Sequence, residues 1–191
     1  MLALQMPLLW RIPDKYPQKA IGAYDTTIPF DRFMLLEGQR IVLPEAKPVV
    51  HFSITAKQLL VYDCLPNSAL VPLLSKRLIH ALRELCEDDF QSIPTVVVAT
   101  DMQLDDYSFL NATTCVPAID HACSNYFMVP ETEQIMGFRK LRHRPNCLGE
   151  RHLARDVEYR SHLLASEKVL GLLRRLKAKG AELLTAEEVH W

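Results

Sequence analysis

Lysine and arginine are absent from residues 84–138, although this stretch carries ten carboxylates. These are Glu84, Glu87, Asp88, Asp89, Asp101, Asp105, Asp106, Asp120, Glu131 and Glu133. The charge then reverses, because residues 139–155 carry six basic side chains against Glu150 alone. Acidic surfaces attract basic proteins and repel nucleic acid. The pattern therefore favours a charged protein as the partner, with ordinary solvated loops and faces as the alternative.

Glycine is scarce, with six in 191 residues, and the sequence has no GxGxxG, Walker or GxSxG motif. Phosphate-binding glycine loops and a serine nucleophile elbow are therefore not expected. Asp105 and Asp106 could in principle act as a general acid and base, but neighbours on a strand point to opposite faces. We expect no catalytic residues.

No apolar run approaches the about 20 residues that cross a bilayer, so no membrane association is expected. Residues 1–10 are apolar, but no basic residue precedes them and Gln5 and Pro7 interrupt them, unlike a secretion signal. The five cysteines form an odd set without close pairs, which favours reduced thiols and a cytoplasmic location.

Metal and nucleic-acid sites are also not expected. His121 lies between Cys115 and Cys123, but this spacing matches no standard tetrahedral zinc module, and no cofactor motif is present. The basic residues 139–155 could contact phosphates. However, only Phe138 lies near them for stacking, and the chain has a net charge of −1.

The composition, 49% apolar and 24% charged, predicts a globular protein of one large or two small domains. Residues 1–62 are rich in proline and aromatic residues and predict an irregular wrap with short strands, including 49–54 and 59–62. Residues 64–68 predict a loop. Residues 63–191 are expected to form the main core.

Two amphipathic helices are predicted in this core. One begins at Ser75, which can cap the free N–H groups of the first turn, and buries leucines and an isoleucine at helical spacing. The other begins at Ser166 in the same way and ends at Gly180. Strands are predicted at 93–99, 107–113, 153–159 with outward charges, and 181–185. The expected class is α+β, with small mixed or antiparallel sheets that are each packed by one helix.

The two helices align with each other when Ser75 is set over Ser166. Leu78, Ile79, Leu82 and Leu85 then match Val169, Leu170, Leu173 and Leu176. A leucine pair precedes each helix, at 73–74 and at 163–164. An internal duplication into two similar halves and a chance likeness between capped helices both remain open.

Four segments resemble the bacterial immunity-protein families catalogued as eleven and forty-three. The first is 71–78 (VPLLSKRL), and the second is 107–111 (YSFLN) followed by Ala118-Ile119-Asp120 and Ser124. The third is 138–141 (FRKL), and the fourth runs from 152–155 (HLAR) to 163–167 (LLASE). The resemblance spans about residues 60–185 and leaves the first 50 residues unmatched.

This resemblance implies a cytoplasmic antitoxin encoded beside a polymorphic toxin that is delivered by contact-dependent or type VI secretion. Such proteins bind the toxin and are not enzymes. If the toxin is a basic nuclease, carboxylates could occupy its phosphate groove. The candidate toxin-binding residues are Glu84, Glu87, Asp88, Asp89, Asp101, Asp105 and Asp106. A non-catalytic adaptor and, more remotely, a small hydrolase are the alternatives, and a homo-oligomer is left open.

Overall fold

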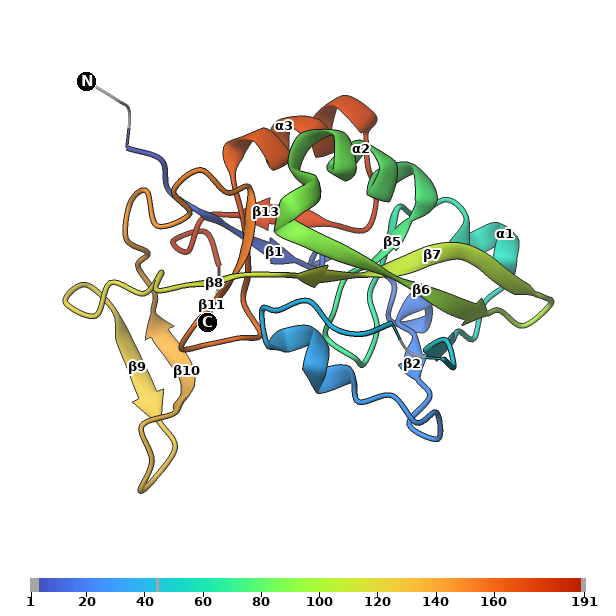
Figure 1. The fold of residues 1–191 in the computed structure, drawn as a ribbon, viewed down its shortest axis with the longest axis horizontal. Coiled ribbons are helices and arrows are strands. Elements are labelled where there is room, and N and C mark those ends of the chain that lie inside the picture. Colours follow the sequence, from blue (N-terminus) through green and yellow to red (C-terminus); the bar gives the residue numbers. More distant parts are fainter. Residues whose placement is uncertain (1–3, 44, 190–191) are drawn as a thin grey trace.

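The fold combines helices with three β-sheets, as seen in the computed structural model, which describes residues 4–43 and 45–189 (Figure 1). Within the described residues there are three α-helices, and the sheets have six, five and two strands. The helices are α1 (Ala56–Leu59), α2 (Lys76–Cys86) and α3 (Glu167–Leu176). The predicted α+β class is confirmed.

The six-stranded sheet is built around a long hairpin. Its order is β2 (Ala23–Tyr24), β3 (Val49–His51), β6 (Phe90–Val98), β7 (Gln103–Ala112), β5 (Leu73–Ser75) and β4 (Cys64–Leu65). Only β3 and β6 are parallel neighbours. The β-branched run at 93–99 therefore forms a central strand, as predicted, because its alternate side chains are buried on the sheet.

The five-stranded sheet has the order β13 (Glu182–Leu184), β1 (Leu8–Arg11), β12 (Leu163–Ala165), β11 (Leu153–Asp156) and β8 (Cys115–Val116). A separate hairpin, β9 (Asn125–Met128) and β10 (Ile135–Lys140), projects from the body (Figure 1). Strand β1 lies between β12 and β13, and β3 lies beside β6. Residues 1–62 thus contribute strands to both large sheets.

The helix at Ser75 begins as predicted, since the Ser75 hydroxyl accepts a hydrogen bond from the N–H of Leu78 at 3.3 Å. The helix after Ser166 forms as well, but its serine bonds the His152 ring at 3.0 Å and makes no cap bond. This helix ends at Leu176 and not at Gly180, and Lys177, in a left-handed conformation, caps its C-terminus. Gly180 instead allows the backbone after α3 to approach Cys64, because a Cβ at this position would lie 1.9 Å from the carbonyl oxygen of Cys64.

Two strand predictions are wrong in part. Residues 59–62 form the end of α1 and a turn, because Gln58 accepts the N–H of Thr55 at 3.0 Å and helps to start a helix there. The strand at 153–159 stops at Asp156, whose carboxylate accepts the N–H groups of residues 158 and 159, both at 2.8 Å. The expected outward charges are also wrong, since Arg155 and Asp156 are buried. In addition, residues 64–65 of the expected loop form β4.

The chain has two halves with the same strand arrangement. The first half has the strand order β4-β5-β7-β6, the second has β11-β12-β1-β13, and every neighbouring pair in both is antiparallel. Helix α2 connects β5 to β6, and α3 connects β12 to β13. In the second half, however, the strand equivalent to β7 comes from the N-terminus. The likeness in sequence is therefore confined to one strand and helix of each half.

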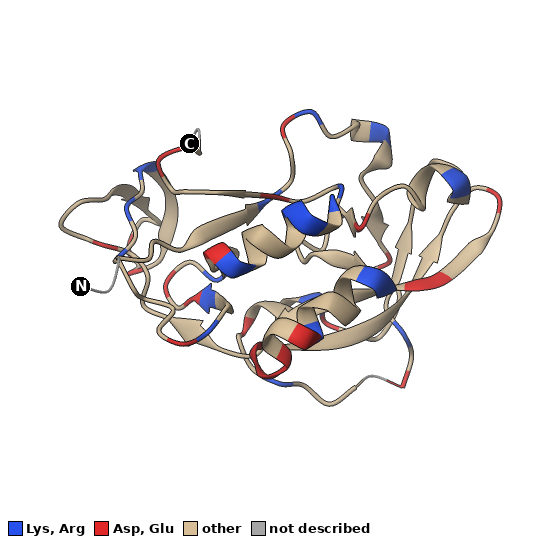
Figure 2. Ribbon diagram, turned by 90° about the horizontal axis from the view of Figure 1, so that it is seen from above, with Lys and Arg blue, Asp and Glu red and all other residues tan. Residues whose placement is uncertain are grey.

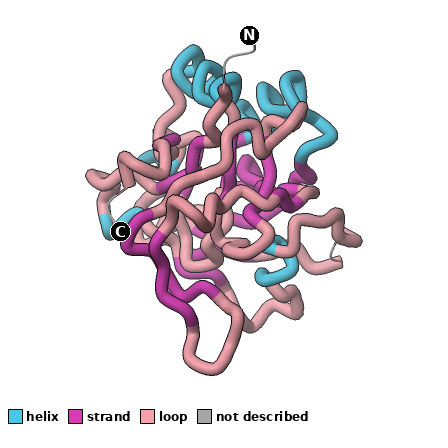
Figure 3. Tube along the Cα trace, turned by 90° about the vertical axis from the view of Figure 1, so that its left-hand side faces the viewer, coloured by secondary structure: helices cyan, strands magenta, loops and turns pink. Residues whose placement is uncertain are grey.

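Helices α2 and α3 lie side by side over one face of the two large sheets (Figure 3). The core between helices and sheets is apolar and includes Leu78, Leu82, Leu153 and Val169. The opposite face of the six-stranded sheet is covered by residues 16–20, 35–41 and 52–59, and that of the five-stranded sheet by residues of β10 and by Ala186 and Val189. Each of the two large sheets is thus covered on both faces.

Candidate functional site

The predicted toxin-binding carboxylates fall into separate groups (Figure 2). Asp106 lies near the start of α2, where it pairs with Lys76 at 2.8 Å. Glu87 follows the last residue of the same helix. Eleven helical residues span about 16 Å at 1.5 Å per residue. The residues at the two ends of α2 therefore do not form one contiguous acidic block.

The carboxylates in and just after the β6–β7 turn are engaged within the protein. Asp101 accepts the N–H of Ala56 at 2.7 Å in the first turn of α1. Asp105 lies 3.6 Å from the ammonium of Lys47, and Asp106 has Lys76 as its partner. Exposed ion pairs of this kind contribute little to stability, but they lower the negative charge that this group presents to a partner.

Asp89 is buried, with 6% of its surface exposed. Its Oδ2 accepts the N–H of His152 at 2.5 Å and the N–H of Leu153 at 3.1 Å. Arg151 lies 3.5 Å from the other carboxylate oxygen. Asp89 therefore ties the end of α2 to the start of β11 and is not offered to a partner.

The remaining predicted residues, Glu84, Glu87 and Asp88, are exposed at the end of α2. Together with Glu150 they line a shallow hollow of about 280 Å³, which we call the α2 recess. Among the described residues, Glu87, Asp88 and Glu150 form no ion pair, and Glu84 has only His80 at 3.5 Å. Arg83 also lines the recess, but its guanidinium donates to the Ser92 hydroxyl at 2.5 Å and forms no ion pair with these carboxylates. Within the part of the chain that the structure describes, the recess is thus where several candidate carboxylates come together without an ion pair to Lys or Arg.

Sequence reasoning missed Glu150, which stands within the basic segment 139–155. Tertiary structure brings it to the recess, because Asp89 holds the adjacent residues 152 and 153 against the end of α2. Most basic residues of that segment have partners inside the protein. Arg142 pairs with Glu187, and Arg144 donates to the carbonyl of Ile119 at 2.9 Å.

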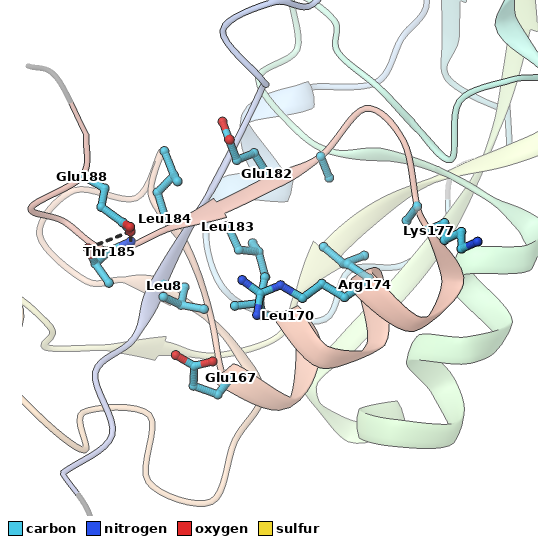
Figure 4. Close-up of a pocket in the computed structure, with 13 residues that line it drawn as sticks. Leu8, Glu167, Leu170, Arg174, Lys177, Glu182, Leu183, Leu184, Thr185 and Glu188 are labelled. Atoms are coloured by element: carbon cyan, nitrogen blue, oxygen red, sulfur yellow. Dashed lines mark hydrogen bonds between the residues drawn. The ribbon is translucent and has the colours of Figure 1, made fainter.

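A second hollow of about 540 Å³ lies between α3 and the edge strand β13 (Figure 4). Glu167 and Glu182 stand on opposite sides of it, and Arg174 and Lys177 also line it. Glu188 is held by the Thr185 N–H at 2.8 Å. The groove is therefore lined by both acidic and basic side chains, and neither sign of charge dominates its electrostatic potential.

The described residues contain no group of three or more His, Cys, Asp or Glu side chains placed to hold a metal ion. Burial raises the pKa of the Cys64 and Cys86 thiols to about 12, so both are protonated and poor nucleophiles at neutral pH. In contrast, the exposed carboxylates of the α2 recess are suited to contact a positively charged surface.

Within the described part of the chain, no helix has the length and apolar character needed to cross a membrane. The sequence matches no protein-family model, and no curated protein is similar to it.

Proposed function

We propose that this chain is an immunity protein, a non-catalytic inhibitor that binds a cognate secreted toxin and occludes the toxin's active site. In this proposal the inhibitor acts in the cytoplasm of the cell that makes it, where its five free cysteines stay reduced. The toxin would arrive by contact-dependent or type VI secretion, and a basic nuclease is the partner that the charge pattern fits best.

Three of the four segments that resemble immunity proteins lie in the two large sheets and the helices packed on them, which supports the proposal, while the remaining segment, 138–141, lies at β10 of the separate hairpin. Segment 71–78 forms β5 and the start of α2, and β5 pairs with β7, which contains segment 107–111. Segment 152–155 lies largely in β11, which pairs with β12 of segment 163–167. Helices α2 and α3 then pack together.

The α2 recess is the observation that carries the proposal. Its carboxylates Glu87, Asp88 and Glu150 are exposed and form no ion pair among the described residues, while Arg83, which also lines the recess, donates to the Ser92 hydroxyl. A protein with a positive groove would attract them over a distance and neutralise them on contact. Asp89 fixes the backbone beneath the recess, so the carboxylates are presented by a preorganised surface.

The direct test is co-expression. The toxin domain encoded by the gene adjacent to this one is produced in a bacterial host with and without this chain, and growth is followed. Purified proteins are then mixed and analysed by light scattering. The proposal predicts restored growth and a complex with one copy of each protein. Growth arrest that persists despite stable co-expression contradicts it.

A further inference from the structure

Strand β13 is the last strand of its sheet, and β1 is its only strand neighbour among the described residues. Its counterpart in the first half, β6, lies between β7 and β3 and has a neighbour on both edges. The groove of about 540 Å³ between α3 and β13 is therefore not closed by a further strand (Figure 4).

This groove has an apolar floor and a charged rim. Leu173 and Leu183 are buried in the floor, and Leu170 is half-buried beside them. The exposed rim residues that form no ion pair with any described residue are Glu167, Arg174, Lys177 and Glu188. An apolar centre with a polar rim is the anatomy of a protein interface. A small-molecule site instead has a few polar groups that converge on the ligand inside the pocket.

Four residues form a stripe along α3 at the border of the groove, at positions 167, 170, 171 and 174. This spacing places them on one face of a helix. The stripe reads glutamate, leucine, glycine and arginine, and its two charges are about 10 Å apart along the axis at 1.5 Å per residue. An acid at one end and a base at the other make the stripe complementary to a second copy that runs in the opposite direction.

A two-fold axis between Leu170 and Gly171 provides a partner for every residue of the stripe. Two antiparallel copies of α3 then place Glu167 of each copy against Arg174 of the other. The same axis places Leu170 of each copy against Gly171 of the other. This reciprocity is the defining property of a two-fold symmetric interface.

Gly171 supports this arrangement, because nothing within one copy requires a glycine there. It is exposed in the middle of α3, its φ is not positive, and an added Cβ would meet no atom within 4 Å. Glycine weakens a helix interior relative to other residues. The missing side chain leaves room for Leu170 of a second copy.

We propose that this chain forms a two-fold symmetric dimer, in which the α3 helices of the two copies pack antiparallel at the groove between α3 and β13. The proposal does not depend on toxin inhibition. The residues that line the α2 recess and those that line the groove are different, so the dimer leaves the recess accessible. Below the dissociation constant of the dimer, a complex with the toxin still has one copy of each protein.

The test is sedimentation equilibrium of the full chain at low salt, over a concentration series that reaches about 500 µM. Two variants each reverse one charge of the stripe, Glu167→Arg and Arg174→Glu. Their matched controls are Glu133→Arg in the β9–β10 turn and Arg175→Glu, the next position of α3, both exposed and outside the groove. Circular dichroism verifies that every variant folds.

We expect a monomer–dimer equilibrium for the wild type. Each reversal in the stripe should raise the dissociation constant about tenfold or more, because like charges then face each other at both ends, while the controls leave it unchanged. An equimolar mixture of Glu167→Arg and Arg174→Glu should associate again, since each charge then meets its opposite. Gly171→Gln should weaken association although it raises the melting temperature at low protein concentration.

A wild type that stays monomeric up to about 500 µM overturns the proposal, as does equal association of the wild type and the two reversal variants. If both folded variants remain monomeric in the mixture, the antiparallel pairing is wrong. A monomeric wild type whose binding to the toxin domain is weakened by Arg174→Glu would assign the groove to the toxin instead and would also overturn the dimer.

Discussion

The carboxylate of Asp89 accepts the backbone N–H of His152 at 2.5 Å and thereby joins the end of α2 to the first strand of the other half. The reverse link is made after α3, where the carbonyl of Lys179 accepts the N–H groups of Asp63 at 2.9 Å and Cys64 at 3.0 Å. The segment that follows each helix therefore binds the first strand of the opposite half. We call these two contacts the crosswise link, and they hold the halves together in addition to the shared apolar core.

Replacing Asp89 with alanine should destabilise the protein by about 2–4 kcal/mol, because it leaves the N–H groups of His152 and Leu153 without their acceptor. Asp88→Ala is the matched control, since the Asp88 side chain is exposed and should cost less than about 0.5 kcal/mol. Urea unfolding followed by circular dichroism measures both. Equal midpoints for the two variants would refute the crosswise link.

Leu82→Ala and Leu173→Ala should each cost about 2–5 kcal/mol, since both leucines are buried between the helices and the sheets. Arg175→Ala on the exposed face of α3 serves as the control and should have little effect. Thermal unfolding is the readout. If both leucine variants melt at the wild-type temperature, the packing of the helices is not as described.

Arg77→Met should destabilise the fold by about 1–3 kcal/mol, because it removes the bidentate partner of Asp63, whose side chain is only 9% exposed. The neighbouring Lys76→Met breaks the exposed pair with Asp106 and should cost less than about 1 kcal/mol. Chemical denaturation of both variants at the same salt concentration makes the comparison. A larger loss for Lys76→Met than for Arg77→Met would contradict it.

His143 should make stability depend on pH. Burial lowers its pKa to about 4 in the folded protein, so the unfolded chain binds more protons between that value and about 6.5. Its contribution is fully present above about pH 6.5 and is lost as the pH falls toward about 4. Between about pH 7.5 and about pH 5.5 the loss should be about 1.4 kcal/mol.

The measurement for this prediction compares wild type with His143→Met by urea unfolding at the two pH values. The variant should lose about 1.4 kcal/mol less than wild type over this interval. His162, whose pKa is lowered to about 3 by burial, remains in both proteins and titrates in the same direction. The same pH dependence in both proteins would show that His143 is not buried in neutral form.

Helices α2 and α3 and the long central strands could be predicted from the sequence, because local signals determine them, whereas α1 was missed. A serine followed by leucines at helical spacing predicts α2, and a β-branched run predicts β6. Strand β1 could not be placed, since its partners β12 and β13 are about 150 residues or more away in sequence and no local signal specifies them. The charged residues of β11 were predicted to face the solvent, and this prediction is wrong for a related reason. A charged residue on a short strand predicts solvent exposure, and only tertiary structure buries Arg155.

The candidate surface was predicted only in part. The acidic composition of residues 84–138 is visible in the sequence, but Lys47 and Lys76, which neutralise Asp105 and Asp106, come from outside that stretch. The burial of Asp89 and the position of Glu150 at the recess likewise depend on contacts between the halves. Charge counts along a sequence cannot anticipate such long-range pairing.

The central claim is the proposal that the α2 recess recognises a toxin. It is tested most directly by association kinetics with the toxin domain that the proposal expects the adjacent gene to encode. Glu87→Lys combined with Asp88→Lys is compared with Glu131→Lys combined with Glu133→Lys, an equal charge reversal of exposed residues in the β9–β10 turn. Circular dichroism verifies that both variants fold.

At low salt, the reversal in the recess should slow association roughly tenfold or more and weaken its salt dependence, while dissociation changes less. The control reversal should have a much smaller effect on the association rate. Equal association rates for wild type and the recess variant at low salt, together with undiminished protection of toxin-producing cells, would contradict the account.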